Sequence, residues 1–392
     1  MLNRDKLAFI DDALNNRKAE KRLRQLVPYE PEEDGVEVKK NGKILLNFSS
    51  NDYLGLSRHP EVISRAVEFT TRYGAGSQAS RLVSGTFDIH RRLEEKLAEV
   101  FDREAALLLN SGFQANSTII GTLADRRSLI LADKLSHNSL LQGALLSRAT
   151  FQRFEHNDLN HLQKLLIRAG ERSFSRIVVI TETVFSMDGD RSPIEEISQL
   201  AQKYDALLYA DDAHAAGVWG PKGLGLASGV PGVDILLGTC GKAFGAFGSY
   251  VVCSGKMRDY LVNFCPGFIY TTALPPAVIG AIDAALDIIP GLESEREAYH
   301  RRIAEVRQAI QDAGFATGPS STQIIPVIIG DERQTLDMAS WLESQGILAT
   351  AIRPPTVPEQ GSRIRFTLSM RHTDEHIERL ITALKSWNRE TS

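Results

Sequence analysis

The sequence predicts an α/β fold with a mostly parallel sheet that is covered by helices on both sides. From about residue 61 to residue 252, short apolar runs alternate with segments of helical periodicity, such as 89–98. The apolar runs lack a polar face, which is typical of strands that are buried on both sides of a parallel sheet. Polar residues also fall where these runs end, namely Glu182, Asp211 and Thr239.

Several strands are expected in this region, each followed by a helix or a loop. They lie at 105–109, 129–132, 177–181, 207–210, 235–237 and 250–253. In open α/β sheets, ligands bind beyond the carboxyl ends of the strands. The polar residues that follow these strands are therefore expected to meet at one edge of the sheet and to line a site.

Two further regions flank this sheet. Residues 1–50 are expected to form an amphipathic helix over about 7–14, a proline-rich linker arm and a short strand near 44–46. Residues 51–288 are expected to form the large domain. Residues 289–392 are expected to form a smaller C-terminal α+β domain. Its strands are expected at 324–329, 347–351 and 364–368, and its helices at 336–344 and 374–387.

The composition is that of an ordinary globular protein. The chain has 392 residues, of which 43% are hydrophobic and 24% charged, and its formal net charge is -4. This balance gives no bias towards nucleic acid or an anionic membrane, and no apolar run reaches the about 18 residues of a membrane span. The first residues show no apolar signal core, so we expect a cytoplasmic protein. The cysteines Cys240, Cys253 and Cys265 lack metal-ligand spacing and are expected to be buried thiols.

The segment 238–245, Gly-Thr-Cys-Gly-Lys-Ala-Phe-Gly, contains the most informative residue, Lys242. Most lysines are solvated at the surface, but this one lies among glycines just after an apolar run. A phosphate-binding loop does not fit, because Leu236 stands where its first glycine is needed and Ala243 replaces the residue that binds magnesium. The glycine spacing predicts close approach of the backbone to a ligand. We interpret Lys242 as an amine that can form an imine with an aldehyde cofactor.

Asp211 and His214 precede this lysine in the pattern Asp-x-x-His. Asp211 alone would most often be a helix cap or a member of an ion pair. Together with His214 and Lys242, it meets the needs of a pyridoxal ring. The carboxylate keeps the pyridine nitrogen protonated, and the imidazole donates to the phenolic oxygen. The three residues predict an enzyme that uses pyridoxal 5'-phosphate.

Other residues could complete such a site. The segment 111–116 opens a helix with a glycine, where backbone N–H groups can bind a phosphate, although a plain turn would look the same. Thr239 would add a hydroxyl group at the same edge. His137 lies just past another strand and is either structural or stacked on an aromatic cofactor. Arg365 alternates with Arg363 in a C-terminal strand. Such pairs are usually solvated, but an arginine can also bind a substrate carboxylate.

Over nearly its whole length, the chain resembles the α-oxoamine synthases, which are fold-type I pyridoxal-phosphate-dependent transferases. The segments that carry the resemblance are 47–56, 111–116, 184–190, 211–214 and 241–242. Two later segments, 269–276 and 351–358, are similar to the 8-amino-7-oxononanoate synthases of biotin biosynthesis. They differ from what is expected of the 2-amino-3-ketobutyrate ligases and of the 5-aminolevulinate and sphingoid-base synthases.

The resemblance implies a role for each cofactor contact. Lys242 is the lysine that holds the cofactor as a Schiff base, Asp211 is the partner of the ring nitrogen, and His137 stacks on the ring. Further contacts serve the phenolic oxygen, the ring edge and the phosphate: His214, Ser186, Gly112, Phe113 and Thr239. Thr271 and Thr272 reach the phosphate of the neighbouring subunit, since the family forms homodimers with shared active sites.

The same resemblance implies the substrates and the reaction. Arg24, His137 and Thr356 contact the substrate, and Arg365 holds a carboxylate. This branch condenses L-alanine with pimeloyl-CoA or pimeloyl-acyl carrier protein and releases carbon dioxide. The sequence leaves the carrier open. Two departures from the family pattern put the preference for the acyl donor in question. They are Gln78, within Gly-Ser-Gln-Ala-Ser, and Cys240.

Three alternatives stay open from the sequence. A sister synthase would condense glycine with a short acyl-CoA. An aminotransferase on the same fold would exchange amino groups with a 2-oxo acid and release no carbon dioxide. A non-catalytic relative would retain only the fold. The joint presence of Lys242, Asp211 and His214 argues against this last reading.

Overall fold

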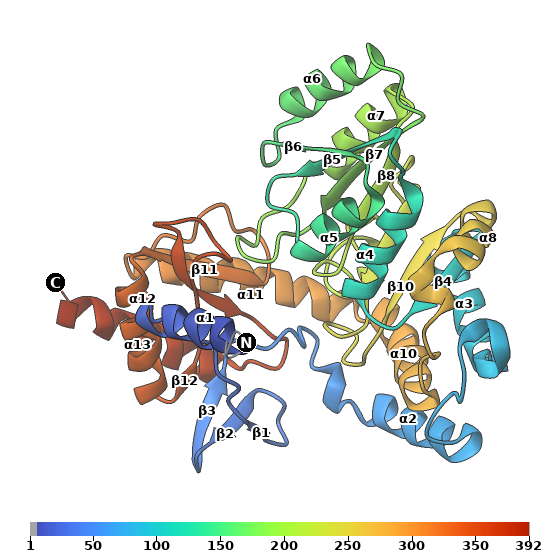
Figure 1. Ribbon diagram of the computed structural model, residues 1–392. Helices are drawn as coiled ribbons and strands as arrows, with labels where there is room; N and C mark the ends of the chain where they lie inside the picture. The colour runs from blue at the N-terminus through green and yellow to red at the C-terminus, as the bar shows by residue number, and fades with distance from the viewer. Residues whose placement is uncertain (1–5, 392) are drawn as a thin grey trace.

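The computed structural model describes residues 6–391 and confirms the α/β fold class (Figure 1). Residues 1–5, part of the segment expected to lack a signal core, lie outside the described residues. Within the described part of the chain, the central sheet has seven strands. In spatial order they are β4 (Ala105–Leu109), β10 (Ser249–Cys253), β9 (Ile235–Thr239), β8 (Leu207–Asp211), β7 (Arg176–Glu182), β5 (Ser128–Asp133) and β6 (Thr150–Phe154). Strand β10 is antiparallel to both neighbours, and the strands from β9 to β6 are parallel.

Every strand expected in this region is present, and β6 is an addition that sequence reasoning missed. Strand β6 lies at the edge of the sheet, where only one residue, Phe154, is fully buried and Arg153 is exposed. An edge strand does not need apolar residues on both faces. It therefore lacks the apolar run that marked the other strands.

Both faces of the sheet are covered by helices, as expected. In β5, Leu129 and Leu131 belong to one hydrophobic core, whereas Ile130 and Ala132 belong to the other. The first core includes residues of α2 (Pro60–Tyr73), α3 (Asp88–Val100), α6 (Leu159–Gly170), α7 (Ile194–Lys203) and α10 (Pro276–Ile288), and it continues into the helices of the C-terminal part described below. Those of the second are α4 (Gly112–Leu123), α5 (Asn138–Ser147), α8 (Gly255–Phe264) and α9 (Pro266–Ile269).

Two smaller sheets lie outside the central sheet, and only the first of them joins strands of the first fifty residues with a C-terminal strand. One contains β1 (Glu30–Pro31), β2 (Glu37–Lys40), β3 (Lys43–Asn47) and β12 (Ile347–Leu348), with β3 parallel to β12. The other contains β11 (Ile324–Gly330), β14 (Ser362–Thr367) and β13 (Thr350–Ile352). The single strand expected at 347–351 is thus two short strands in different sheets. The proposed domain limits at residues 50 and 288 stay a prediction.

Four longer helices accompany these sheets: α1 (Ala8–Ala19), α11 (Glu293–Asp312), α12 (Glu332–Ser344) and α13 (Asp374–Thr391). The single-turn helices are η1 (Leu56–Arg58), η2 (Arg81–Gly85), η3 (Pro221–Gly223) and η4 (Ile289–Gly291). The amphipathic helix expected at the N-terminus is α1, which buries none of its residues. The three cysteines are free and buried, as expected. Among residues 6–391, no helix has the length and apolar character that crossing a membrane requires.

Candidate active site

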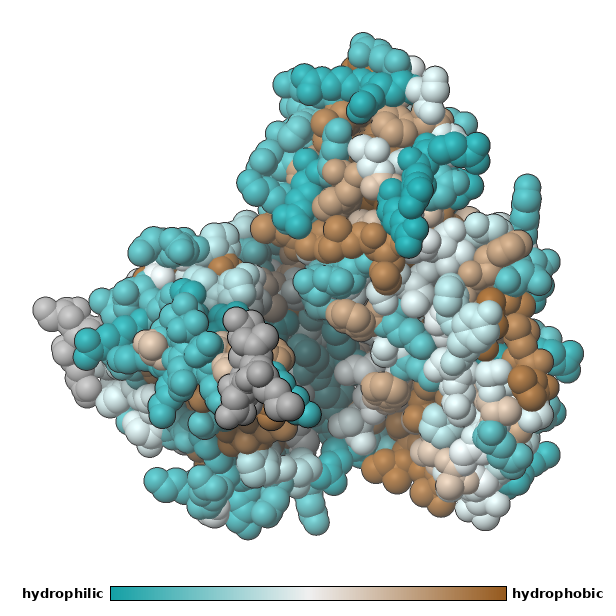
Figure 2. Space-filling model, viewed as in Figure 1, coloured by the Kyte–Doolittle hydropathy of each residue, from teal (hydrophilic) through white to brown (hydrophobic). Residues whose placement is uncertain are grey.

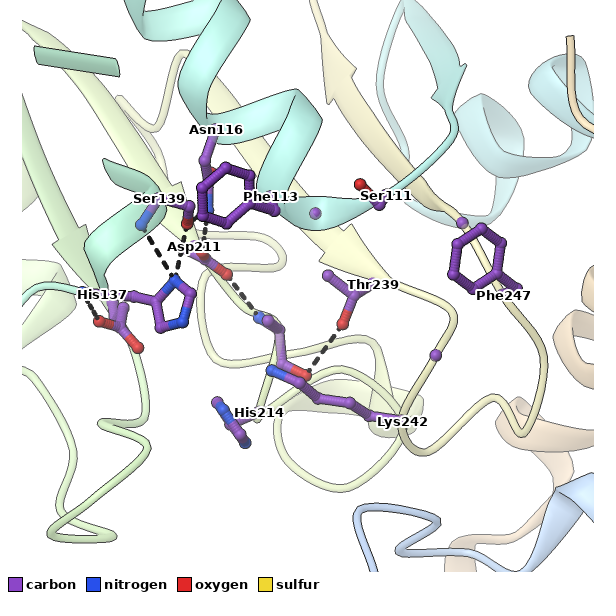
Figure 3. Close-up of a pocket in the computed structure, with 15 residues that line it drawn as sticks. Ser111, Phe113, Asn116, His137, Ser139, Asp211, His214, Thr239, Lys242 and Phe247 are labelled. Atoms are coloured by element: carbon purple, nitrogen blue, oxygen red, sulfur yellow. Dashed lines mark hydrogen bonds between the residues drawn. The ribbon is translucent and has the colours of Figure 1, made fainter. Parts of the chain in front are cut away.

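A cavity of about 240 Å³ opens where several strands of the central sheet end (Figure 3). Glu182, Asp211 and Thr239 are the last residues of β7, β8 and β9, and all three line the cavity. The expectation that polar residues meet at one edge of the sheet is therefore confirmed. The remaining lining residues are Ser111, Gly112, Phe113, Asn116, His137, Ser139, Ala213, His214, Gly241, Lys242, Phe247 and Gly248.

Asp211 lies at the base of this cavity with its carboxylate held in a fixed direction. Its Oδ2 accepts a hydrogen bond from Asn116 Nδ2 at 2.7 Å, and its Oδ1 accepts one from the backbone N–H of Ala213 at 2.9 Å. Asn116 is held in turn by Tyr209, whose hydroxyl donates to Asn116 Oδ1 at 2.8 Å. Sequence reasoning quoted Asn116 in the segment 111–116 but gave it no role. Its place one helical turn after Gly112 was the available signal.

Lys242 lies in the turn after β9 and lines the cavity together with Asp211 and Glu182. Burial lowers the pKa of Lys242 to about 8, with help from the charge of Arg365, although Asp211 and Glu182 act in the opposite direction. A neutral amine is a nucleophile and a base, so this environment prepares the lysine for either task.

Two of the glycines around Lys242 are explained by packing within the protein, whereas the sequence predicted that these glycines allow the backbone to approach a ligand. A Cβ atom on Gly238 would lie 2.2 Å from the ring of Tyr250, and one on Gly245 would lie 2.1 Å from the backbone nitrogen of Ser57. Gly245 also has a φ of +63°, which disfavours other residues. Both glycines are thus required by packing within the protein. Gly241 has no atom within 4 Å of such a Cβ and lines the cavity.

His214 is buried against Tyr53, a residue to which no role was assigned. The Tyr53 hydroxyl lies 2.7 Å from His214 Nδ1 and 3.1 Å from Asn51 Oδ1. Burial lowers the pKa of His214 well below its usual value, and the nearby charges of Lys242 and Arg365 lower it further. His214 is therefore neutral at physiological pH and can take part in hydrogen bonds as both donor and acceptor.

His137 lies just before α5, on the side of the cavity away from Phe247 (Figure 3). Its Nδ1 is 2.7 Å from Ser139 Oγ, and its backbone N–H donates to Glu182 Oε1 at 2.5 Å. Burial lowers the pKa of His137, as does the charge of Lys242. Glu182 is buried, which raises its pKa well above the usual value, and the charge of Asp211 raises it further. Glu182 was predicted at this edge but had no assigned role.

The N-terminus of α4 faces the cavity and can bind an anion. Ser111 caps this helix by accepting from Gln114 N–H at 3.2 Å. A Cβ on Gly112 would lie 2.5 Å from Thr239 Cγ2, so only glycine lets the helix approach β9 this closely. Helix N-termini present free N–H groups and a partial positive charge. Phe113 follows with its side chain 53% exposed.

Arg363 and Arg365 point to the same side of β14, as their alternation predicted. Arg365 donates from Nε to the Ser186 carbonyl oxygen at 2.5 Å, and its Nη atoms lie 3.5 Å from Asn51 Oδ1. Arg363 binds Asp188 instead, from Nη1 to Oδ1 at 2.5 Å. Of these two arginines, it is Arg365 whose charge lowers the pKa of Lys242 and of His214. The charge effects thus distinguish Arg365 from Arg363, although neither arginine lines the cavity. Ser186 also lies outside the lining, and its carbonyl group holds Arg365.

Four residues predicted for the site lie elsewhere in this single chain. Thr271 Oγ1 accepts from Asn110 Nδ2 at 3.1 Å, and the carbonyl oxygen of Thr272 accepts from the same amide at 2.8 Å. Arg24 and Thr356 line a separate cavity of about 450 Å³, which also contains the side chains of Arg17, Arg22 and Arg353. The structure therefore brings most of the predicted cofactor contacts together in one cavity, namely Gly112, Phe113, His137, Asp211, His214, Thr239 and Lys242. It leaves Thr271, Thr272, Arg24 and Thr356 outside that cavity.

The two departures from the family pattern have different surroundings. Gln78 is exposed and has a φ of +67°, a conformation that glycine adopts without strain. Cys240 is fully buried beside the Lys242 turn, and burial raises the pKa of its thiol. Neither side chain lines the cavity, and their effect on the acyl donor stays a prediction.

Comparison with known proteins gives consistent matches over nearly the full length. The family described as aminotransferase class I and II matches residues 43–384. A relative from Desulfosudis oleivorans is 51% identical over 98% of this chain and 99% of its own. The 8-amino-7-oxononanoate synthases of Gluconacetobacter diazotrophicus and Geobacter sulfurreducens are 46% and 43% identical. They cover 97% and 91% of this chain, and 97% and 92% of their own lengths.

Solved structures share the fold. A serine palmitoyltransferase from S. paucimobilis, solved with a bound PLP-myriocin aldimine, has a TM-score of 0.93 at 26% identity and covers 99% of both chains. The 8-amino-7-oxononanoate synthase of Francisella tularensis has a TM-score of 0.76 at 24% identity and covers 88% of this chain and 98% of its own. The second likeness concerns the fold alone.

Proposed function

Since this chain belongs to the 8-amino-7-oxononanoate synthases, within the wider class I and II aminotransferase family, we propose that it condenses L-alanine with a pimeloyl thioester in biotin biosynthesis. The thiol carrier leaves when the new carbon–carbon bond forms, and carbon dioxide leaves from the alanine carboxyl group. The observation that carries this function is the meeting of Lys242, Asp211 and His214 in one cavity, in a chain up to 51% identical to its relatives. The charge of Arg365 lowers the pKa of both Lys242 and His214.

The donor set of the cavity fits pyridoxal 5'-phosphate. A lysine amine can react with the aldehyde, and an oriented carboxylate can pair with the ring nitrogen. A helix N-terminus can bind the phosphate. Lys242, Asp211 and the start of α4 would hold these groups, while His214 and His137 would contact the ring. When bound, the cofactor supplies an electrophilic carbon for the amino group and an electron-accepting ring that stabilises negative charge at Cα.

Lys242 is the base that removes the proton from the Cα of alanine. With a pKa of about 8, a substantial share of the amine is neutral at physiological pH. The same amine, once protonated, can return a proton to carbon after carbon dioxide has left. Asp211 would face the ring nitrogen in a fixed direction, because Asn116 and the Ala213 N–H both donate to its carboxylate.

Arg365 holds the carboxylate of alanine. Its Nε donates a hydrogen bond to the Ser186 carbonyl oxygen. Its two Nη atoms both lie 3.5 Å from Asn51 Oδ1, which is the long end of a hydrogen bond. These N–H groups are therefore available for a bidentate bond with a carboxylate. A carboxylate fixed in this way keeps the bond that breaks in the decarboxylation in one orientation.

We assign the second cavity, which contains Arg24 and Thr356, to the acyl donor. Its arginines Arg17, Arg22, Arg24 and Arg353 suit a negatively charged group. Arg22 also forms an ion pair with Glu332, which ties the segment after α1 to α12. Whether the pimeloyl group arrives on coenzyme A or on an acyl carrier protein is decided by assay with each donor.

A homodimer with shared active sites is part of this proposal. Large apolar side chains are exposed beside the cavity: Phe113 is 53% exposed and Phe247 55%. Tyr270, next to Thr271 and Thr272, is 84% exposed. A second subunit would cover these side chains and would bring its two threonines to the phosphate. We also place the enzyme in the cytoplasm, where its free cysteines would stay reduced.

The test is a panel of amino acids against acyl donors, with carbon dioxide release as the readout. L-alanine, glycine and L-serine are combined with pimeloyl, acetyl, succinyl and palmitoyl thioesters, and 2-oxo acids are added to test for transamination. The proposal expects the highest kcat/KM for alanine with a pimeloyl donor. Preference for glycine with a short acyl group, or for serine with palmitoyl-CoA, would assign the chain to a sister activity. Amino exchange without carbon dioxide would overturn the reaction type.

A further inference from the structure

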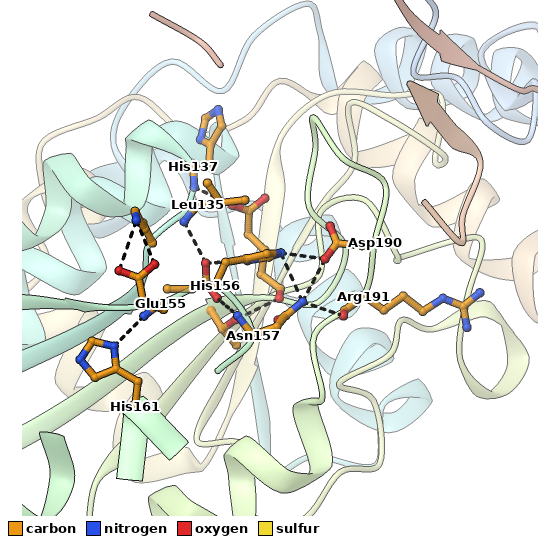
Figure 4. A network of polar contacts seen from close by, with 12 residues as sticks. Leu135, His137, Glu155, His156, Asn157, His161, Asp190 and Arg191 are labelled. Atoms are coloured by element: carbon orange, nitrogen blue, oxygen red, sulfur yellow. Dashed lines mark hydrogen bonds and ion pairs between the residues drawn. The ribbon is translucent and has the colours of Figure 1, made fainter. Parts of the chain in front are cut away.

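A histidine joins two buried carboxylates beside the cavity (Figure 4). His156 Nδ1 lies 2.9 Å from Asp133 Oδ1, and its Nε2 lies 2.8 Å from Asp190 Oδ2. Asp133 is fully buried, and Asp190 is 6% exposed. A neutral imidazole has a single N–H group and can donate to only one of the two carboxylates. An imidazolium, which carries an N–H group on each ring nitrogen, can donate to both carboxylates at once.

The electrostatics of the surroundings agree with a charged ring. Burial lowers the pKa of His156, but the hydrogen bonds and charges of Asp133 and Asp190 outweigh burial and raise the pKa to about 10. Without this cation, the two buried carboxylates would lie together with no ion-pair partner among the described residues. Such an arrangement is strongly unfavourable.

One end of this bridge fixes the loop that carries His137. Asp133 is the last residue of β5, and its Oδ1 also accepts from the Leu135 N–H at 2.8 Å. Its Oδ2 accepts from the Asn157 N–H at 2.9 Å. The short loop from Asp133 to His137 is thus bonded at its start to Asp133 and at its end to Glu182.

The other end fixes the loop that carries Ser186. The Asp190 carbonyl oxygen accepts from the Phe185 N–H at 3.1 Å, and Asp190 Oδ2 accepts from Asn157 Nδ2 at 2.9 Å. The His156 ring packs against Phe185 edge-on, with ring centroids 4.4 Å apart. Ser186, the next residue, presents the carbonyl group that holds Arg365 Nε.

We propose that His156 is a positioning residue of the active site, an imidazolium that holds the His137 loop and the Ser186 loop in fixed relation to each other. It acts through His137 at one end and through Arg365 at the other, and it touches neither substrate nor cofactor. This inference rests on the proposed function, because it assigns His137 and Arg365 to the reaction.

Two substitutions separate the two ends. His156→Asn keeps an amide donor near the position of Nδ1, and His156→Gln keeps one near that of Nε2. His156→Asn is expected to release Asp190 and thereby Arg365, which raises the KM for alanine about tenfold. His156→Gln is expected to release Asp133 and thereby His137, which lowers kcat about tenfold with a smaller change in KM.

His161→Asn is the matched control. His161 Nδ1 accepts from the Glu155 N–H at 3.1 Å, so it contacts the residue just before His156 but reaches neither carboxylate (Figure 4). The kcat and KM of the His161→Asn variant are expected to equal those of the wild type. The three variants are compared as folded protein saturated with pyridoxal phosphate, and the dissociation constant and absorption spectrum of the cofactor are measured as well.

A purely structural role of His156 would lower the melting temperature of the two variants but leave the kcat, KM and cofactor spectrum of their folded form unchanged. That result overturns the inference. A wild-type protein without activity towards alanine and a pimeloyl donor would instead contradict the proposed function, and the cofactor spectra of the variants would still test the bridge.

Nitrogen NMR of the wild-type protein, labelled with ¹⁵N in its histidines, tests the same inference if the variants fail to fold. Both ring nitrogens of His156 are expected to carry protons at neutral pH and to keep them at pH 8. A signal typical of a neutral imidazole at pH 7 would overturn the inference.

Discussion

Asn116 Nδ2 lies 2.7 Å from Asp211 Oδ2 and orients the carboxylate at the base of the cavity. The amide belongs to the first turns of α4, the same helix whose N-terminus faces the cavity. One helix therefore serves both the anion site and the carboxylate. Any change in its packing against β8 and β9 would move both groups together.

Replacing Asn116 by alanine is expected to weaken the hold on Asp211. The carboxylate would keep the Ala213 N–H but lose its only side-chain donor among the described residues. Since a hydrogen bond to a charged group contributes about 1.5–3 kcal/mol, kcat/KM should fall about 10- to 100-fold. Steady-state kinetics with alanine measure this effect. Asn263→Ala serves as the control and should keep full activity, because Asn263 is exposed and its Nδ2 donates to the Asp259 carbonyl oxygen.

The amine of Lys242 is expected to titrate near pH 8 in the cofactor-free protein, well below the pKa of about 10.4 of an ordinary lysine. Its labelling by an amine-selective reagent, followed by peptide mass spectrometry as a function of pH, measures this. Because the charge of Arg365 lowers the pKa of Lys242, Arg365→Met should shift the midpoint of labelling to higher pH. A labelling midpoint that this substitution does not change would show that the charge of Arg365 does not act on Lys242.

Gly245→Ala is expected to destabilise the fold more than Gly229→Ala. Both glycines have positive φ, but a Cβ on Gly245 meets the backbone of Ser57, whereas one on Gly229 meets nothing within 4 Å. Backbone strain alone should cost Gly229→Ala about 1 kcal/mol, and the clash should bring Gly245→Ala to about 3 kcal/mol or more. Urea denaturation measures both changes. Equal losses would contradict the packing account of the Lys242 turn.

The stability of the fold is expected to fall as the pH rises towards 10, in part because His156 loses its proton. The pKa of His156 is raised from 6.5 to about 10 in the folded state. Such a group contributes its full stabilisation of the fold below its unfolded pKa, and this contribution is lost as the pH rises towards the folded pKa. Asp133 and Asp190 are the charged groups that face His156. Denaturation midpoints of the wild type and of His156→Asn, compared at pH 7 and pH 9.5, should converge at the higher pH. A constant difference would contradict this assignment.

The central sheet and the base of the site could be predicted because they depend on local patterns. Runs such as 177–181 are buried on both faces, and the residues that end them must emerge at one edge of the sheet. The edge strand β6 has no such run and was missed. The pair β12 and β13 was read as one strand, because its division between two sheets depends on partners that are distant in the sequence.

The supporting residues of the site could not be assigned from single motifs. Asn116, Tyr53 and Glu182 act through contacts with Asp211, His214 and His137. The fold creates these contacts. For Asn116, its place one helical turn after Gly112 was a signal, but no spacing in the sequence gave Tyr53 or Glu182 a role. The glycines near Lys242 illustrate the opposite problem. Their spacing is real, but its cause is packing rather than a ligand. A Cβ on Gly238 would collide with Tyr250, and one on Gly245 would collide with Ser57.

The most direct test of the account is to reduce the protein with borohydride after it has been saturated with pyridoxal phosphate, and to map the modified peptide by mass spectrometry. Borohydride converts an imine between lysine and an aldehyde into a stable amine. The account predicts that the pyridoxyl group is found on Lys242 and that Lys242→Ala protein carries none at this site. A label on another lysine, or its absence from the wild-type protein, would contradict the account.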